Sequence, residues 1–285
     1  MNILKKYIEY IRSYCSPSSN LPGSYVRALR YTSEALRAYV PKYSVLPPIW
    51  EIRSLDIIDE LYQFVKEEER KGENGAFGNS KFPMSYLKQR FCTNALKTFG
   101  RFISLALREK AAFETYENEF DANLVAEKIS SLPIKKPQWY LDDDERISSQ
   151  RGRETIRQVK QRQNQWIFRQ MMLKNYGSAC CLTGLPVLEA LRASHIVGWS
   201  ENEKTRLLPT NGLCLAATYD AVFDKHLITF DDDLRMVLSP LLREYCTNTA
   251  FENTFRHYEG TQLQCHVRFP PDKVLMARHR EQLRK

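Results

Sequence analysis

Apolar residues recur three or four positions apart through most of the first 110 residues, which is the period of an amphipathic helix. This pattern predicts helices over residues 2–14, 24–40, 52–65 and 85–110. Proline, glycine and serine are concentrated between them, as is usual where helices end. Residues 1–132 are therefore expected to form a mainly helical domain.

The helical period is lost after this region. Pro133, Pro137 and the acidic run Asp142–Glu145 raise the polarity and break the apolar pattern, which favours a connecting segment over a core element. We predict a linker at residues 133–153 and a second domain at residues 154–285.

A basic helix is predicted to open the second domain. Residues 151–174 carry seven basic side chains and one acidic side chain, together with apolar residues such as Trp166 and Phe168 on what would be the inner side. The apolar side could pack on the domain while the basic side follows a phosphate backbone; the alternative is a connecting helix that is basic for solubility. The candidate DNA-binding residues are Arg157, Lys160, Arg162, Arg169 and Lys174.

Short elements of both kinds follow in residues 180–240. Ala193–Val197 is expected to form a strand, Asn211-Gly212 a turn, and the apolar positions from Leu213 to Phe223 a short helix. Two apolar segments, 227–230 and 235–238, flank three aspartates and predict a small hairpin. Together with the helical first domain, this indicates an α+β fold class.

Three residues in this stretch carry candidate chemistry. His195 could accept a proton near neutral pH, because a neutral imidazole is a base in that range. Asp220 and Asp224 are four residues apart, so a helix would place both carboxylates on one face, where they could bind one hard cation. Oxygen ligands favour Mg²⁺ or Mn²⁺ over zinc. A base and a cation are what the hydrolysis of a phosphodiester bond requires.

The ordered set His195, Asn211, Asp220 and Asp224 resembles the HNH endonucleases, and more narrowly those of restriction type, over roughly residues 165–240. The resemblance implies a ββα-metal fold in the C-terminal nuclease domain, with His195 as general base and Asn211 orienting it. It also implies that Asp220 and Asp224 are metal ligands. Many members have His or Asp before the catalytic histidine as a metal ligand, whereas this chain has Ser194, a poorer ligand at the same place in the expected metal site.

Two further features of the resemblance concern metal and histidine chemistry. Some HNH proteins hold a structural zinc with two Cys-x-x-Cys pairs, and this spacing is missing around Cys180, Cys181 and Cys214, so we expect no structural zinc and three small buried residues. His226 follows the predicted helix and is a candidate for assisting the leaving group.

The composition of the chain bears on its expected partner and location. The formal net charge of +8 is compatible with a polyanionic partner, expected to be double-stranded DNA. The seven cysteines are irregularly spaced, and the N-terminus lacks the apolar block of a signal peptide, which favours a cytoplasmic location. No apolar run is long enough for a bilayer, so no membrane is expected as a partner. Whether the protein forms a homodimer is left open.

We therefore expect a metal-dependent DNA endonuclease, by analogy a restriction or defence enzyme that acts on foreign DNA, with dependence on DNA modification left open. Two alternatives stay open: a catalytically degenerate DNA-binding protein, and a toxin-like non-specific nuclease.

A different nuclease signature, Asp…Glu-x-Lys, is formally matched by Asp59, Glu69 and Lys71. This signature requires its residues on adjoining strands, whereas these three residues fall in or just after a helical pattern.

Overall fold

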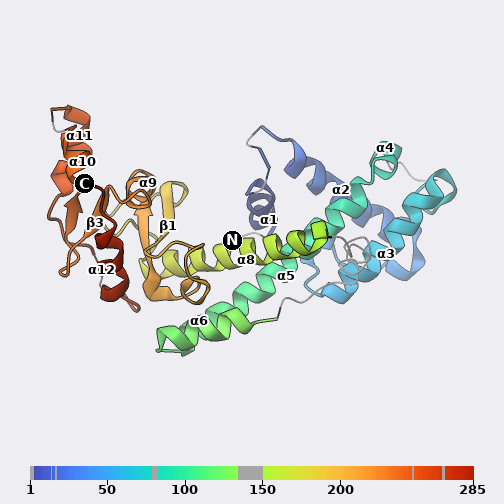
Figure 1. Ribbon diagram of the computed structural model, residues 1–285. Coiled ribbons are helices and arrows are strands. Elements are labelled where there is room, and N and C mark those ends of the chain that lie inside the picture. The colour runs from blue at the N-terminus through green and yellow to red at the C-terminus, as the bar shows by residue number, and fades with distance from the viewer. Residues whose placement is uncertain are drawn as a thin grey trace. The chain divides into compact units, whose positions relative to one another are not determined.

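A computed structural model describes residues 3–13, 15–16, 18–78, 83–133, 150–245, 247–264 and 267–285, without the side chains of residues 150–160 and 162 (Figure 1). The linker predicted at residues 133–153 lies outside the described residues except at its two ends. Within the part that is described, no helix combines the length and the apolar composition needed to cross a bilayer.

The chain divides into two compact units. The first holds residues 1–108 together with the described part of 133–157, and the second holds residues 109–132 and 158–285. The predicted domain boundaries differ from this division, because residues 109–132 group with the second unit. Ala112, Tyr116 and Ile129 of that segment are buried in the same apolar cluster as Phe168 and Met172. The spacing of apolar residues along a helix shows that the helix has a buried side, but it does not show in which unit that side is buried.

Helices build the first unit, as the sequence predicts. They are α1 (Ile3–Arg12), α2 (Leu21–Tyr39), α3 (Leu55–Lys71), α4 (Met84–Lys88) and the first part of α5 (Phe91–Asn118), with short 3₁₀ turns at Pro41–Tyr43, Ile49–Glu51 and Gly72–Asn74. Their inward faces meet in one core that includes Tyr7, Leu36, Ile58 and Phe99, each at most 1% exposed. Asp59, Glu69 and Lys71 all lie on α3, so the strands that the competing nuclease signature needs are replaced by a helix.

The single helix predicted over residues 85–110 is wrong at its start. It is broken into α4 and α5, because Arg90 adopts a left-handed conformation with φ 56°. Glu69 of α3 then accepts the backbone N–H of Thr93 in the first turn of α5, at 3.1 Å. A carboxylate from another helix thus caps the new helix, as an N-cap side chain would. This tertiary contact is absent from the local sequence pattern.

The second unit combines helices with two small sheets (Figure 1). Strand β1 (Leu191–His195) pairs antiparallel with β2 (Gly212–Ala216), and β3 (Ile228–Phe230) pairs antiparallel with β4 (Met236–Leu238). The remaining elements are the last part of α5, α6 (Ala122–Ser131), α8 (Gln150–Asn175, from residue 158 on), α9 (Ala217–Phe223), α10 (Pro240–Arg243), α11 (Thr249–Thr254) and α12 (Lys273–Glu281), and 3₁₀ turns at Leu188–Ala190, Glu203–Thr205, Pro209–Asn211 and Arg256–Tyr258.

The predicted elements of residues 180–240 are partly confirmed. A strand is present at the Ser194-His195 pair, but it spans Leu191–His195 and so ends two residues before the predicted strand at 193–197. The β3–β4 hairpin and the predicted basic helix are also present. The prediction that residues 213–216 belong to a helix is wrong, because they form β2 and only residues from Ala217 onward are helical. All five residues of β2 are buried, so the strand shows no alternation of apolar and polar positions.

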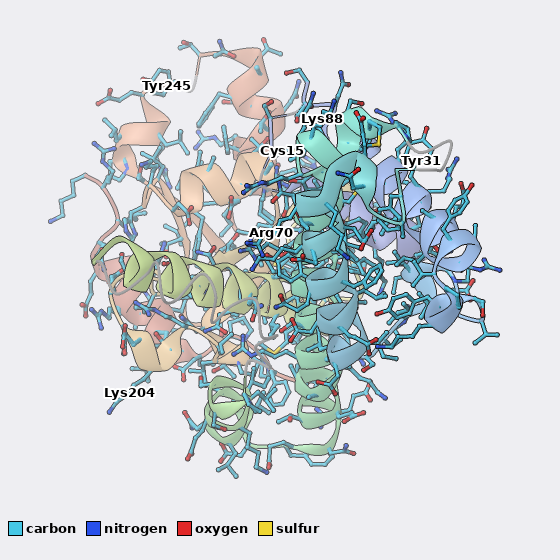
Figure 2. All side chains as sticks on the ribbon, turned by 90° about the vertical axis from the view of Figure 1, so that its right-hand side faces the viewer. Cys15, Tyr31, Arg70, Lys88, Lys204 and Tyr245 are labelled. Carbon is cyan, nitrogen blue, oxygen red and sulfur yellow. The ribbon has the colours of Figure 1, made fainter. Side chains whose placement is uncertain are left out.

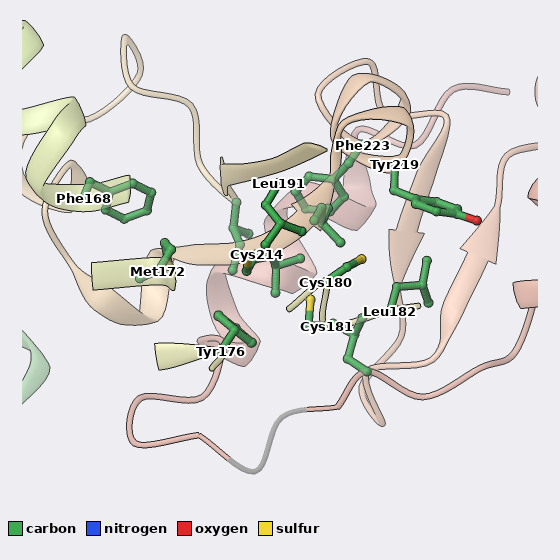
Figure 3. Close-up of a cluster of buried hydrophobic side chains, with 14 of the residues drawn as sticks. Phe168, Met172, Tyr176, Cys180, Cys181, Leu182, Leu191, Cys214, Tyr219 and Phe223 are labelled. Carbon is green, nitrogen blue, oxygen red and sulfur yellow. The ribbon is translucent and has the colours of Figure 1, made fainter. Parts of the chain in front are cut away.

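The core of the second unit lies between α8 and the β1–β2 pair. Figure 3 shows Phe168 and Met172 of α8, Tyr176 directly after the end of α8, Leu191 of β1 and Cys214 of β2 in this cluster. Cys180, Cys181 and Cys214 are at most 2% exposed and are free thiols, which confirms the prediction that they are small buried residues. Burial raises the pKa of the Cys214 thiol to about 12, so this thiol stays protonated near neutral pH.

Candidate active site

Asn211 holds together the loop that joins β1 to β2. Its side chain is fully buried, and its Oδ1 accepts the backbone N–H of Val197 at 2.9 Å. Its Nδ2 donates to the carbonyl oxygens of Val197 and Thr205, at 3.1 and 3.0 Å. The backbone N–H of Ile196 also donates to the Asn211 carbonyl, at 3.1 Å. Because Ile196 and Val197 directly follow His195, these bonds fix the chain where β1 ends.

His195 ends β1 and is partly buried. Its Nε2 lies 3.1 Å from the carbonyl oxygen of Arg206, which can only accept, so Nε2 carries the proton in this arrangement. The ring stacks on Phe168, with centroids 3.8 Å apart, and meets Trp199 edge to face at 5.4 Å. Burial lowers the pKa of His195 to about 4, although the bond to Arg206 acts in the opposite direction. The imidazole is therefore neutral near pH 7, and Nδ1 keeps a lone pair that can accept a proton.

Gly212 allows Phe168 to reach the histidine. Gly212 lies opposite His195 in the β1–β2 pairing, and a Cβ at this position would lie 2.5 Å from Cζ of Phe168 and 2.6 Å from Sδ of Met172. Gly212 has extended backbone torsions that any residue adopts, so the requirement is for space. The carbonyl oxygen of Gly212 also accepts the hydroxyl of Tyr176 at 3.0 Å. Helix α8 thus packs directly on the strand that faces the candidate base.

Ser194 and Asp220 are brought together by the fold. Ser194 is 2% exposed, and its Oγ donates to Oδ1 of Asp220 on α9 at 2.6 Å. This is a short hydrogen bond to a charged acceptor, a type that is stronger than one between neutral groups. Ser194 therefore orients the carboxylate of Asp220. Its hydroxyl oxygen also stands where the resemblance would have a metal ligand.

Asp224 lies one turn further along. Its backbone N–H donates to the carbonyl oxygen of Asp220 at 2.9 Å, so the two aspartates are separated by one helical turn, as the sequence predicts. Partial burial and the nearby Asp220 carboxylate both raise the pKa of Asp224. Two carboxylates that repel each other in this way favour a cation between or beside them.

This donor set fits a hard cation. Mg²⁺ commonly binds through one or two carboxylates while it keeps several water molecules, and Asp220 and Asp224 supply two. Across the described residues, no three His, Cys, Asp or Glu side chains are grouped so that they could hold a metal ion. The described residues thus do not group His195 with both carboxylates as a set of metal ligands.

The candidate DNA-binding residues divide into two groups. The side chains of Arg157, Lys160 and Arg162 lie outside the described residues. Arg169 donates to the carbonyl oxygens of Leu191 and Leu188, at 2.7 and 3.0 Å. Lys174 forms an ion pair with Glu117 and lies over the ring of Phe113 at 5.2 Å. Both described side chains already have protein partners, and Arg169 fastens α8 to the start of β1.

His226 lies against a second histidine. It follows α9 with a left-handed φ of 53°, and its ring centroid is 4.5 Å from that of His279 on α12. His279 stacks on Phe223 at 3.9 Å, and its two ring nitrogens lie within hydrogen-bond distance of the Thr229 hydroxyl and the Phe223 carbonyl. Burial lowers the pKa of His279 to about 4. This neutral histidine attaches α12 to α9.

The residues that surround His195 are not predicted by the sequence pattern. Phe168 is predicted only as an apolar helix position, and Arg206 is not singled out at all. Arg206 contributes its carbonyl oxygen to His195, while its guanidinium donates to the Trp199 carbonyl at 2.7 Å and pairs with Glu203 at 2.9 Å. Because every residue has a backbone carbonyl, the sequence does not show that the carbonyl of Arg206 accepts a hydrogen bond from His195. The glycine in Asn211-Gly212 is a usable signal, but its pattern predicts a turn rather than a close approach.

Comparison with known proteins supports the resemblance for one segment. Residues 180–231 match the family model described as HNH endonuclease. The match contains the whole of β1, β2 and α9, and with them His195, Asn211, Asp220 and Asp224. No curated protein matches the chain.

The Gly212→Ala substitution tests the packing of α8 on the histidine. The added methyl group would overlap Phe168 and Met172, so we expect a loss of about 1–3 kcal/mol in the free energy of unfolding, as for other overpacked sites. Chemical denaturation followed by tryptophan fluorescence measures it. Gly23→Ala is the control, because its nearest atom, at 3.7 Å, is in ordinary contact. Equal effects of the two substitutions would contradict the close approach.

Proposed function

We propose that the HNH endonuclease segment at residues 180–231 makes this chain a metal-dependent DNA endonuclease that hydrolyses phosphodiester bonds. The observation that carries the proposal is the placement of His195, with its proton on Nε2 and Nδ1 left as an acceptor, in a segment that matches this family. The β1–β2–α9 order supports a ββα-metal arrangement of the site.

In this mechanism, His195 acts as the general base. A base must be unprotonated before it acts, and burial under Phe168 keeps the imidazole neutral at physiological pH. Nδ1 accepts the proton of the attacking water, and the Arg206 carbonyl holds the Nε2 side of the ring in place. Asn211 keeps the following residues fixed and so orients the base.

The two carboxylates provide the acidic side of the site. Asp220, oriented by Ser194, and Asp224 would hold Mg²⁺ or Mn²⁺. Such a cation, when bound, offsets the negative charge that develops on the phosphate and on the leaving oxygen. Ser194 acts on Asp220 through its hydrogen bond, so its substitution should affect the carboxylate rather than the base. His226 is a candidate for assisting the leaving group.

Double-stranded DNA is the proposed substrate, with restriction of foreign or modified DNA as the proposed role. The basic composition of residues 151–174 supports contact with a phosphate backbone through Arg157, Lys160 and Arg162. Arg169 and Lys174 would have to release protein partners to make such contacts. We propose a cytoplasmic location and leave a homodimer open. A degenerate DNA-binding protein would leave plasmid intact with either metal, and a toxin-like nuclease would cut unmodified DNA without discrimination.

The His195→Ala substitution tests the base. We expect the rate of plasmid cleavage to fall at least about 100-fold, in line with the usual contribution of a general base, while DNA binding measured by fluorescence anisotropy is retained. His257→Ala is the matched control, because His257 is exposed and lies outside the site. If the His195→Ala protein cleaves plasmid as fast as the wild type, another group is the base.

The carboxylates are tested by metal titration. Asp220→Asn and Asp224→Asn each remove a negative charge from the cation site, so we expect the concentration of Mg²⁺ or Mn²⁺ needed for half-maximal cleavage to rise about tenfold or more. Plasmid nicking over a range of metal concentrations measures this. Asp233→Asn, an exposed aspartate in the β3–β4 turn, is the control. Cleavage that persists in EDTA would rule out a metal-dependent mechanism.

A further inference from the structure

Half of the residues that line a cavity in the first unit are cationic. Its volume is about 600 Å³, and it lies where α3 approaches the α4–α5 turn and the start of α5. Its lining includes Lys66 and Arg70 from α3, Lys88 from α4, Arg90 from the turn and Lys97 from α5. Arg70 and Lys88 are labelled in Figure 2. We call this cavity the basic pocket.

The one acidic residue in the lining, Glu69, is hydrogen-bonded to Thr93. Glu69 accepts the backbone N–H of Thr93 through Oε1 at 3.1 Å and the Thr93 hydroxyl through Oε2 at 2.8 Å. Burial raises the pKa of Glu69, and the hydrogen bonds to Thr93 oppose this shift. Both of its oxygens thus bond to Thr93 at the start of α5, and the lining holds five cationic residues and this one acidic residue. The lining keeps a net positive charge.

Arg90 is held in an uncommon backbone conformation at the edge of the pocket. Its φ of 56° lies in the left-handed region, which is unfavourable for a residue with a side chain. Such conformations persist where the surrounding structure enforces them, and they are concentrated at functional sites. The break between α4 and α5 at this residue brings Arg90 and Lys88 to the same cavity as the α3 cations.

Two lysines are positioned by an aromatic ring. The ammonium groups of Lys66 and Lys97 lie 5.7 and 5.4 Å from the centroid of Tyr62, which is itself 4% exposed. These contacts restrict the two side chains before a ligand arrives, which lowers the entropy cost of binding. Arg70 and Lys88 pair with Glu67 and Glu73, at 3.2 and 3.6 Å, but all four side chains are exposed. Exposed ion pairs of this kind contribute little and exchange readily.

We propose that the basic pocket binds the phosphate groups of a nucleotide ligand. Convergent lysine and arginine side chains recognise phosphate oxygens, and a space of this volume accommodates more than one phosphate. Two kinds of ligand carry such phosphate groups: the backbone of a nucleic-acid strand and a free nucleotide. The proposal does not depend on nuclease activity, because it concerns residues of the first unit and makes no use of His195, Asp220 or Asp224.

The test measures binding by the full chain in EDTA, so that no cleavage occurs. One probe is a short fluorescein-labelled DNA duplex, followed by anisotropy at several salt concentrations, and the other is ATP, followed by titration calorimetry. The double variant Lys88→Glu/Arg90→Glu reverses two cations of the basic pocket. Lys5→Glu/Arg37→Glu makes the same change of charge at exposed positions that do not line the pocket. A variant that fails to fold is replaced by Lys88→Gln/Arg90→Gly, since glycine tolerates the positive φ of position 90.

The two sources give different supporting results. If the ligand is a DNA backbone, the pocket variant binds the duplex at least about tenfold more weakly than the control variant, and its salt slope falls by about one for each phosphate that is no longer neutralised. If the ligand is a free nucleotide, ATP binds the wild type and the control, and the pocket variant no longer binds ATP. The proposal is overturned if the wild type binds neither probe. It is equally overturned if the pocket and control variants bind both probes alike.

Discussion

The contact of Phe168 with His195 and Gly212 is the constraint on which the candidate site depends. The ring of Phe168 stacks on the imidazole at 3.8 Å and occupies the space that a side chain at position 212 would fill. Through this contact α8 packs on the β1–β2 pair and shields one face of the His195 ring from water. Desolvation disfavours the charged imidazole, so the histidine stays neutral without an acidic partner. The absence of a side chain at position 212 leaves the space that Phe168 needs to stack on the candidate base.

The two sides of the site have opposite electrostatic character. His195 is surrounded by aromatic rings and a carbonyl oxygen, whereas Asp220 and Asp224 lie one helical turn apart, and burial together with the Asp220 carboxylate raises the pKa of Asp224. The only described hydrogen bond from a side chain to these carboxylates is that of Ser194. Such a division suits hydrolysis, because a neutral base and a cation-binding pair of carboxylates do not neutralise each other.

The sequence predicts those parts of the fold that local patterns encode. Helical spacing locates α3, and the spacing of Asp220 and Asp224 places them one turn apart, because both depend on the 3.6-residue period. Strand β2 is missed, since a run of five buried residues has no alternating polarity and looks like part of a buried helix. The break at Arg90 and the surroundings of His195 depend on tertiary contacts, which residue identity alone does not reveal.

The preparation of His195 as a neutral base can be measured by an NMR titration of the full chain with ¹⁵N-labelled histidine, with His195→Gln used to assign the resonance. We predict that His195 is neutral at pH 7 with its proton on Nε2, and that it titrates well below the ordinary histidine pKa of about 6.5. A proton on Nδ1, or titration near 6.5, would contradict the claim that burial under Phe168 prepares this imidazole as a base.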